Sequence, residues 1–296
     1  MNSKQAIGID VGGTNIKGVL INKNGEVLKK VTKETDKKGV LWKDTTLRVL
    51  HELQGGKLDN LPIGLSAPGL ANETQDAIAC MPGRLDGLEE LKWADFFKVN
   101  KVNVLNDAHA ALLAESTFGV AVGTENFIML TFGTGVGGAI MINGSIYKGF
   151  NGIAGHFGHM SLHADSTKLG ITNMPGSLED AVGESTVKLR CNGKFSTVKE
   201  LVDAYRRGDQ LAEELWMKSV RELAIGVCSI CNILSPEKVI IGGGIANAKE
   251  SLFDPLDTFM DMYEWRPRGT KTIIQRAKFH EYAGAIGAAA FAFQNN

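Results

Sequence analysis

The sequence predicts an α/β protein of two lobes, each built around a glycine-rich turn between apolar strands. In the stretch Ile7–Gly18, an apolar strand ends at Asp10, and the turn Gly12-Gly13-Thr14 leads into a second apolar strand over 16–21. The same pattern of strand, glycine turn and strand recurs from Phe127, with its turn over 133–138. A third glycine turn, over 242–244, also follows an apolar strand. Because these strands alternate with segments of helical period, an α/β fold with two similar lobes is expected.

Size and composition agree with a globular protein of two domains. The chain has 296 residues, of which 44% are hydrophobic and 22% charged, and this length suits two domains of roughly 100–200 residues each. A net charge of −1 and a pI near 6.6 leave no basic footprint for nucleic acid. No apolar run approaches the ~20 residues that span a bilayer, and residues 1–5 lead into a strand without a signal-peptide core. We therefore expect a cytoplasmic enzyme.

The first 118 residues are expected to form the first lobe. Asn24-Gly25 is a hairpin signal, and Leu47, Leu50 and Leu53 repeat on one helical face. The expected strands are 7–10, 16–21, 26–32 and 102–105, and 63–69 is expected to be a short strand that enters a turn. The expected helices are 44–53 and 108–118, and 72–86 is a loop.

The expected lobe boundary lies at 119–124, so that the second lobe covers 119–282. Thr197 is a candidate N-cap for a helix, and Asn143-Gly144 is another hairpin signal. Residues 151–173 are irregular and rich in histidine, as in a functional loop. The expected strands are 127–131, 138–142, 239–241 and 272–274, and the helices are 178–189, 198–205, 210–234, one after residue 244, and 283–293. In the last helix, Gly284 and Gly287 favour close packing.

The four cysteines predict no disulfide framework. Cys228 and Cys231 have CxxC spacing but lie within an apolar helical segment, 223–234, with no second pair to complete a zinc site. Core packing is the favoured interpretation.

The glycine turns themselves have two interpretations. Glycine adopts a positive φ without steric cost, so Gly12-Gly13 can close an ordinary tight hairpin. Glycines also leave backbone N–H groups uncovered and able to point at an anion. Three such turns favour a bound nucleotide over three unrelated hairpins.

Several motifs together resemble those of the ROK family of sugar kinases, within the actin-like, ribonuclease H-like ATPase superfamily. The motifs are Asp10-Val-Gly-Gly-Thr14 with Lys17, Ser66-Ala-Pro-Gly69, Asn106-Asp107-Ala108, Thr131-Phe-Gly-Thr-Gly-Val-Gly-Gly138, Gly155-His-Phe-Gly-His159 and Ile241-Gly-Gly-Gly-Ile245. They occur in family order over nearly the whole chain. The resemblance implies ATP-dependent phosphorylation of a hexose hydroxyl, in a central cleft between a small N-terminal and a larger C-terminal lobe. It also implies that the last helix, 283–296, returns to the small lobe.

On the sugar side, the resemblance implies that Asp107 takes the proton from the sugar hydroxyl and that Asn106 hydrogen-bonds the sugar. From the residues alone, Asp107 is equally a candidate N-cap of the helix that begins at Ala108. Within the Ser66–Gly69 motif, Ser66, Pro68 and Gly69 are the expected sugar contacts.

On the phosphate side, Asp10 is the expected magnesium carboxylate, acting through water, because Mg²⁺ keeps much of its hydration. The alternative is a carboxylate that only caps a turn. The expected phosphate contacts in the first turn are Gly12, Gly13, Thr14, Asn15 and Lys17. The alternative for Lys17 is an ordinary side chain on a solvated face of the strand. Thr134, Gly135 and Gly137 form the second phosphate turn, and Gly243 and Gly244 are expected against adenosine.

The sequence departs from its relatives on the sugar side. They usually carry Glu-x-Gly-His, whose Glu and His contact sugar hydroxyls, whereas this chain has His156 before Gly158 and His159. An imidazole donates as well as accepts, while a carboxylate only accepts, so recognition near the anomeric carbon is open. Glu179 matches a further sugar-contacting carboxylate, or is an acidic residue favoured in the first turn of a helix.

A structural zinc is not expected. The family signature C-x-C-G-x-x-G-C aligns with 170–177, where all three cysteines are missing. A metal bound by His156, His159 and His163 is the alternative, since imidazole is a common zinc ligand.

The simplest interpretation is a glucokinase. Kinases for fructose, mannose, N-acetylmannosamine or N-acetylglucosamine are alternatives, as is polyphosphate as the phosphoryl donor. A ROK repressor is disfavoured, because the first glycine turn begins within about ten residues of Met1, and a non-catalytic sugar sensor is disfavoured by Asp10 and Asp107. A homodimer is a further possibility. Arg84 and Trp93 lie in a loop region that often borders the sugar.

Overall fold

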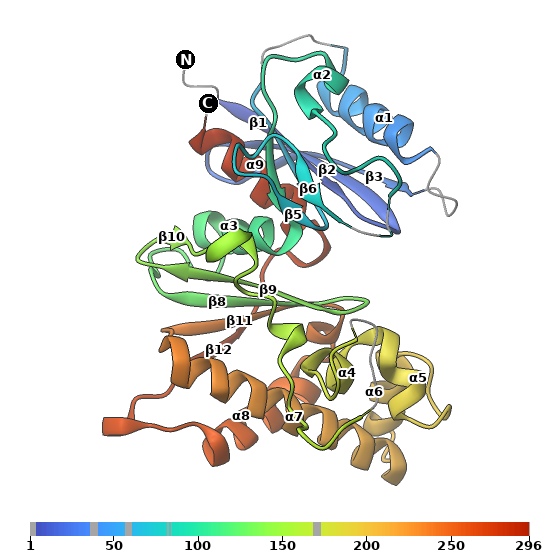
Figure 1. Ribbon diagram of the computed structural model, residues 1–296, viewed down its shortest axis with the longest axis vertical. Helices are drawn as coiled ribbons and strands as arrows, with labels where there is room; N and C mark the ends of the chain where they lie inside the picture. Colours follow the sequence, from blue (N-terminus) through green and yellow to red (C-terminus); the bar gives the residue numbers. More distant parts are fainter. Residues whose placement is uncertain are drawn as a thin grey trace. The chain divides into compact units, whose positions relative to one another are not determined.

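The computed structural model describes residues 4–35, 41–56, 61–81, 83, 85–167 and 173–295, drawn in Figure 1. The chain forms two compact units. Unit 1 holds residues 1–123, 149–153 and 278–296, and unit 2 holds 124–148 and 154–277. The lobe limits expected from the sequence, at 118/119 and 282/283, stay predictions.

Unit 1 contains a five-stranded mixed sheet in the order β3-β2-β1-β4-β7. The first three strands form an antiparallel meander, and β4 and β7 add in parallel to β1. A separate two-stranded sheet pairs β5 with β6. The strands of unit 1 are β1 (Gln5–Val11), β2 (Asn15–Asn22), β3 (Val27–Glu34), β4 (Ile63–Ala67), β5 (Leu70–Ala71), β6 (Ile78–Cys80) and β7 (Asn103–Asn106).

Helices cover both faces of this sheet (Figure 1). On one face, α1 (Trp42–Gln54) and α2 (Trp93–Phe97) form a core with Ile7 and Ile9 of β1. On the other face, α3 (Asp107–Phe118) and α9 (Ala283–Gln294) pack against Ala6 and Val19. This two-layered burial explains why β1 is apolar on both faces, as expected for a central strand.

The glycines of α9 and of the strands beneath it allow close packing. A Cβ at Gly287 would overlap the carbonyl of Ala110 in α3, and one at Gly8 would overlap the carbonyl of Ala285. A Cβ at Gly284 would lie 2.6 Å from the Asp10 carboxyl carbon. The close packing predicted for Gly284 and Gly287 is therefore confirmed, and α9 belongs to unit 1.

Unit 2 repeats the strand arrangement of unit 1. Its sheet has the order β10-β9-β8-β11-β12, with an antiparallel meander of β8, β9 and β10 and with β11 and β12 parallel to β8. The strands are β8 (Phe127–Phe132), β9 (Val136–Ile142), β10 (Ser145–Ile146), β11 (Lys238–Gly243) and β12 (Ile273–Arg276). The α/β class with two similar lobes, predicted from the recurring glycine hairpins, is confirmed.

The core of unit 2 lies between this sheet and a layer of helices (Figure 1). Trp216 of α7 is fully buried in it, together with Leu130 of β8 and Leu256 of α8. The helices are α4 (Leu178–Val182), α5 (Val187–Arg190), α6 (Val198–Arg206), α7 (Gln210–Leu234) and α8 (Glu250–Tyr263). Short 3₁₀ turns lie at 150–152, 157–159, 184–186, 244–248, 267–269 and 280–282.

Three local predictions are wrong. The expected helix over 178–189 is broken into α4, a 3₁₀ turn and α5, because Gly183 leaves the helical conformation, with ψ of 149°. The segment 72–86 is not all loop, since it contains β6. The first hairpin turn contains no positive φ at Gly12 or Gly13. Instead, Gly12 is needed because a Cβ would lie 2.7 Å from the carbonyl oxygen of Asn15.

Candidate active site

In unit 1, the expected sugar and magnesium residues gather at the carboxyl ends of three parallel strands. Asp10 pairs in register with Ser66, and Ala67 pairs with Asn106, so that the ends of β1, β4 and β7 meet at one edge. Ligands of open α/β sheets commonly bind at this edge.

Asp10 is a half-buried residue of β1 that lies between Ser66 of β4 and Lys17 of β2. The Ser66 hydroxyl donates a hydrogen bond of 2.8 Å to its Oδ1, and Lys17 lies opposite it in β2. Burial raises the pKa of Asp10 from 3.8 to about 6; the Ser66 hydrogen bond opposes the rise, the Asp107 charge adds to it, and Lys17 lowers it. Burial thus disfavours the ionised form of this carboxylate, and its magnesium role stays a prediction.

This pKa predicts a pH-dependent stability. Between about pH 4 and pH 6 the folded protein keeps a proton on Asp10 that the unfolded chain has released, so the free energy of unfolding falls as the pH rises through this window. In Asp10→Asn this contribution is absent. We expect wild type to lose stability relative to Asp10→Asn from pH 4 to 7 in urea denaturation series. A difference that stays constant with pH would contradict the raised pKa.

Asp107 is the first residue of α3, but it is Asn106 that acts as N-cap. The Asn106 side-chain oxygen accepts hydrogen bonds from the N–H groups of Ala108 and His109, at 2.9 and 3.3 Å. Its amide nitrogen donates to the Gly69 carbonyl at 2.8 Å. Asp107 is exposed at the helix end, and its Oδ1 also accepts from the N–H of Ala108, at 2.8 Å. The N-cap of α3 is therefore Asn106, and Asp107 adds one hydrogen bond to the same helix end.

The Ser66–Gly69 turn is fixed to the same edge. Ser66 is fully buried, and Gly69 has a φ of 98°, which favours glycine. A Cβ at Gly69 would also lie 2.5 Å from the carbonyl oxygen of Cys80. Pro68 is half-buried beside it. Its sugar-contacting role, like those of Ser66 and Gly69, stays a prediction.

The first glycine turn offers exposed backbone. The N–H of Gly12 donates to the carbonyl of Asn15 at 3.1 Å, whereas Gly13 and Thr14 are exposed. Lys17 is not a freely solvated side chain: its ammonium group pairs with the Glu281 carboxylate at 3.3 Å and donates to the Glu281 carbonyl at 3.1 Å. It therefore contributes positive charge near Asp10 while being tied to the turn before α9.

In unit 2, Glu179 braces the second glycine turn. Its Oε2 accepts a hydrogen bond of 2.8 Å from the N–H of Val136, and a Cβ at Gly135 would overlap the same carboxylate. The Glu179 side chain is buried, in the first turn of α4 behind the N-cap Ser177. Thr134 is exposed at the tip of the turn. A structural role for Glu179 is thus visible, and its sugar contact stays a prediction.

The three histidines of the expected functional loop do not converge. The rings of His156 and His159 are stacked at 5.9 Å with an interplanar angle of 13°, whereas His163 Nε2 lies 3.1 Å from Glu222 Oε1. The buried Nδ1 of His159 has no hydrogen-bond partner among the described residues. Within the same part of the chain, no three His, Cys, Asp or Glu side chains are grouped so as to hold a metal. Residues 170–172 of the aligned zinc signature, and Arg84, lie outside the described residues.

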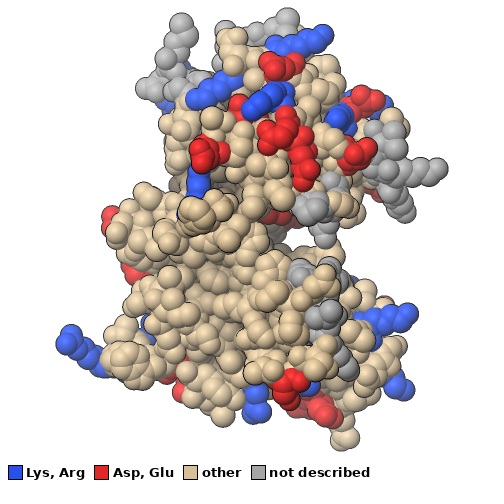
Figure 2. Space-filling view, in the orientation of Figure 1, with Lys and Arg blue, Asp and Glu red and all other residues tan. Residues whose placement is uncertain are grey.

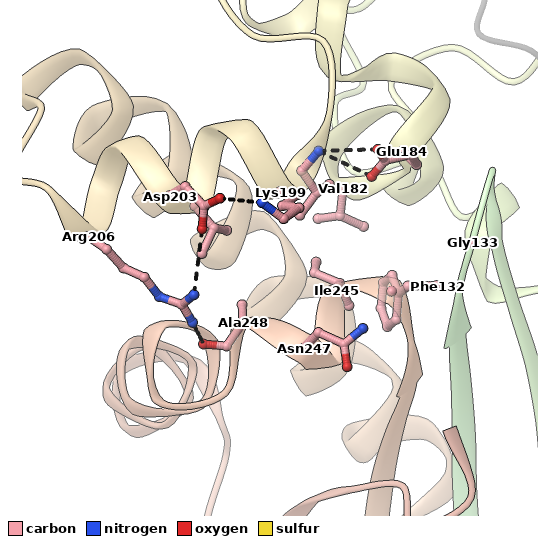
Figure 3. Close-up of a pocket in the computed structure, with 13 residues that line it drawn as sticks. Phe132, Gly133, Val182, Glu184, Lys199, Asp203, Arg206, Ile245, Asn247 and Ala248 are labelled. Atoms are coloured by element: carbon pink, nitrogen blue, oxygen red, sulfur yellow. Dashed lines mark hydrogen bonds and ion pairs between the residues drawn. The ribbon is translucent and has the colours of Figure 1, made fainter. Parts of the chain in front are cut away.

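The third glycine turn borders a cavity of about 480 Å³ in unit 2 (Figure 3). Gly243 has a φ of 82°, and a Cβ there would overlap the carbonyl of Phe132, whereas Gly244 lines the cavity. The lining is apolar at its base and charged along α6, and it comprises Phe132, Gly133, Val182, Glu184, Val198, Lys199, Val202, Asp203, Arg206, Gly244, Ile245, Asn247 and Ala248. Sequence reasoning found only the glycine turns of this set.

The charged side chains of the cavity are held in place. Lys199 pairs with Asp203 at 2.7 Å, and Arg206 donates to the Ala248 carbonyl at 2.6 Å (Figure 3). Glu184 accepts from the N–H of Val198 at 3.2 Å. Lys199, Asp203 and Arg206 follow the polar face of the amphipathic helix α6, so no spacing in the sequence distinguishes them.

One residue expected to border the sugar has another role, and the CxxC pair has the role expected for it. Trp93 is fully buried and packs at 5.9 Å from Trp42, which makes it a core residue of unit 1. Cys228 and Cys231 are buried in α7, and burial raises the pKa of Cys228 to about 12. The prediction that the CxxC pair is core packing is confirmed.

Two further surface properties agree with the composition. None of the helices described is long and apolar enough to cross a membrane. On the face shown in Figure 2, Lys and Arg are interspersed with Asp and Glu and do not gather into one patch.

Known proteins resemble the chain over nearly its whole length. The ROK family matches residues 6–295. A glucokinase of Thermotoga maritima is 30% identical over 98% of this chain and 97% of its own. A beta-glucoside kinase of Listeria monocytogenes is 28% identical over 94% of each chain.

A solved structure agrees with these sequence relatives. A ROK glucokinase from Streptomyces griseus, in complex with glucose and AMPPNP, has a TM-score of 0.82 at 25% identity and matches 98% of this chain and 99% of its own. The family match, the sequence relatives and the shared fold point to one conclusion. The chain belongs to the ROK family and is a sugar kinase, a phosphotransferase.

Proposed function

We propose that the chain is an ATP-dependent hexose kinase, most simply a glucokinase that forms glucose 6-phosphate, with Asp107 as the general base. The observation that carries this proposal is that Asn106 caps α3 and leaves the Asp107 carboxylate exposed at the helix end. A general base must reach the proton that it removes. The similarity to glucokinases supports glucose as the simplest substrate.

In the proposed reaction, Asp107 accepts the proton of the sugar hydroxyl as that oxygen attacks the γ-phosphorus of ATP. The bond between this phosphorus and the β–γ bridging oxygen breaks, and ADP leaves. Asn106 hydrogen-bonds the sugar through its amide nitrogen, which has a second N–H besides the one donated to the Gly69 carbonyl. Because phosphoryl transfer depends mainly on positioning and charge stabilisation, the rigidity of this helix end matters.

Asp10 fits the proposed role at magnesium. Its pKa is raised to about 6 by burial and by the neighbouring Asp107 charge, and a divalent cation relieves both effects. When bound, Mg²⁺ supplies neutralisation of phosphate charge. The exposed Gly13–Thr14 backbone and the Lys17 ammonium are the expected phosphate contacts beside it.

We assign the cavity along α6 to the adenosine of ATP. Its volume of about 480 Å³ and its apolar base formed by Phe132, Val202 and Ile245 suit a nucleoside, since small-molecule pockets are mostly apolar with a few polar groups. A polyphosphate chain binds through cations and gains nothing from an apolar surface, and the cations Lys199 and Arg206 of this lining are paired with Asp203. The cavity therefore favours ATP over polyphosphate as donor.

Narrowing this cavity tests the donor assignment. Gly244 lines it, and a Cβ there would meet only the Phe132 carbonyl oxygen, at 3.8 Å. We expect Gly244→Val to raise the KM for ATP by roughly 10-fold to 200-fold, with the sugar KM unchanged, in steady-state assays. Gly244→Ala is the matched control, with a smaller effect. An equal loss of polyphosphate-dependent turnover would contradict a nucleoside in this cavity.

His156 makes glycosides a second candidate class of substrate. A carboxylate cannot donate a hydrogen bond, but an imidazole can donate one to the ether oxygen of a substituted anomeric position. The similarity to a beta-glucoside kinase supports this alternative. We expect His156→Glu to shift the ratio of kcat/KM values from methyl β-glucoside towards glucose by about tenfold, measured in competition. An unchanged ratio would remove His156 from anomeric recognition.

A coupled ADP-release assay tests the proposal as a whole. The panel contains glucose, mannose, fructose, N-acetylglucosamine, N-acetylmannosamine and methyl β-glucoside, each with ATP and Mg²⁺. Glucose is expected to give the highest kcat/KM. If another sugar exceeds it, the substrate is corrected, and if no hexose stimulates ADP release, the proposed hexose kinase is wrong.

A further inference from the structure

A buried carboxylate at the far end of α3 is not used by the proposed chemistry. Glu115 is fully buried, and an isolated buried charge is costly unless hydrogen bonds compensate it. Here three backbone N–H groups do so. Its Oε1 accepts from Lys278 and Phe279, at 2.7 and 3.1 Å, and its Oε2 accepts from Val120 at 3.0 Å.

These three N–H groups belong to two places where the chain passes between its units. The chain leaves unit 1 after residue 123, returns to it for residues 149–153, and enters it a last time at Lys278. Val120 therefore lies just before one connection, and Lys278 and Phe279 lie just after another. One carboxylate thus holds the unit 1 ends of the first and the last of these connections.

Other contacts tighten the same point. The Lys278 ammonium group donates to the carbonyl of Phe118 at 2.8 Å, and the N–H of Ala121 donates to the carbonyl of Glu115 at 3.0 Å. Gly119 fits only without a side chain, because a Cβ there would overlap the Glu115 carboxylate. We call residues 115, 118–121, 278 and 279 the Glu115 clamp.

The clamp is joined to both acidic residues of the proposed site by rigid elements. Asp107 begins α3 and Glu115 lies two turns later on the same helix. From Phe279 the chain enters α9, whose Gly284 packs against the Asp10 carboxyl group, and α9 packs on α3 through Gly287 and Ala110. The helices α3 and α9 thus connect the clamp with Asp107 and Asp10.

We propose that Glu115 is a positioning residue, which ties the two connections to the helix that presents Asp107 and so keeps that carboxylate in its reactive orientation during turnover. Bending of these two connections is then confined to residues 122–124 and 276–277, beyond the clamp. This inference rests on the proposed roles of Asp10 and Asp107. It concerns the rate of phosphoryl transfer, not the binding of sugar or nucleotide, since the Glu115 carboxylate accepts its hydrogen bonds from backbone N–H groups of unit 1.

The test uses Glu115→Gln in the full chain. A Gln amide can accept at one side only and places an NH₂ group against the N–H donors of the other side. We expect amide hydrogen exchange to rise selectively in peptides covering 118–124 and 276–282. We also expect kcat to fall roughly 10-fold to 100-fold, with the KM values for sugar and ATP within about twofold of wild type.

Two further variants make the outcome decisive. Gly119→Ala displaces the carboxylate without removing it and should give the same exchange pattern and the same loss of kcat; it decides the matter if Glu115→Gln does not fold. Val49→Ala, in the core around α1, is the matched control: it lowers the melting temperature but should leave kcat unchanged.

The outcomes separate the clamp from the proposed function. The positioning role is overturned if amide exchange in 118–124 and 276–282 is unchanged. It is also overturned if a Glu115 variant loses no more kcat than Val49→Ala does when both lose the same amount of melting temperature. If no hexose is phosphorylated by wild type, the proposed function fails, while the exchange pattern still reports whether the clamp exists.

Discussion

Asp107→Asn is expected to lower kcat by ~10²–10⁴-fold, the usual contribution of a general base, with the KM for sugar and ATP little changed. The substitution removes the proton acceptor but keeps an oxygen for the hydrogen bond from Ala108. Because Asn106 supplies the helix cap, the fold should be kept. Initial rates of ADP release, together with thermal melting, measure both properties.

The matched control is Asp44→Asn. Asp44 is also an exposed carboxylate in the first turn of a helix, α1, and so has the same favourable interaction with the helix dipole. It should keep wild-type kcat. If Asp107→Asn retains more than about a tenth of wild-type kcat, Asp107 is not the base, whatever its effect on melting.

The second large effect is expected from Asp10→Asn, which should lower activity by ~10–100-fold, as is typical for a residue that acts on a metal through its outer shell. At the same time the variant should be more stable than wild type at pH 7, because it removes a carboxylate whose ionisation burial disfavours. A loss of activity combined with a gain in stability is the signature of a residue kept for function. Activity measured as a function of Mg²⁺ concentration should show a raised half-saturation point.

Asp76→Asn provides the opposite control within unit 1. Hydrogen bonds from Asn72, Lys92 and Thr74 lower the pKa of Asp76 to about 2, the one from Asn72 most, so its charged form is favoured and its neutral replacement should destabilise. It should leave activity unchanged. An Asp10→Asn variant with wild-type dependence on Mg²⁺ would remove Asp10 from the magnesium site.

Much of the fold could be predicted because its signals are local. Alternation of apolar strands and helical faces predicted where β1, β2, β4 and β7 lie along the chain. The repeated glycine hairpin predicted a second lobe of the same pattern, which the two sheet orders confirm. The break at Gly183 and the short β5–β6 pair could not be predicted, because elements of two to five residues have too few positions to show a period.

The same division applies to the candidate site. Asp10, Ser66, Asn106 and Asp107 could be named from motifs because each lies at or beside the end of a strand. Strand ends at one edge of a parallel sheet meet in space. The cavity lining on α6 was missed, because Lys199, Asp203 and Arg206 have the spacing of any solvated helix face. Glu179 was named for the sugar, but its nearest visible partner is the N–H of Val136.

By itself, the sequence determined the α/β class, the two repeated glycine hairpins and the family, since all three depend on residue order and short-range pattern. Only the tertiary structure decided that Asn106 and not Asp107 caps α3, that burial raises the pKa of Asp10, and that Glu115 joins residues more than 150 positions apart. Hydrogen-bond partners and burial depend on which distant segments of the chain come into contact, and a local sequence pattern does not specify those contacts.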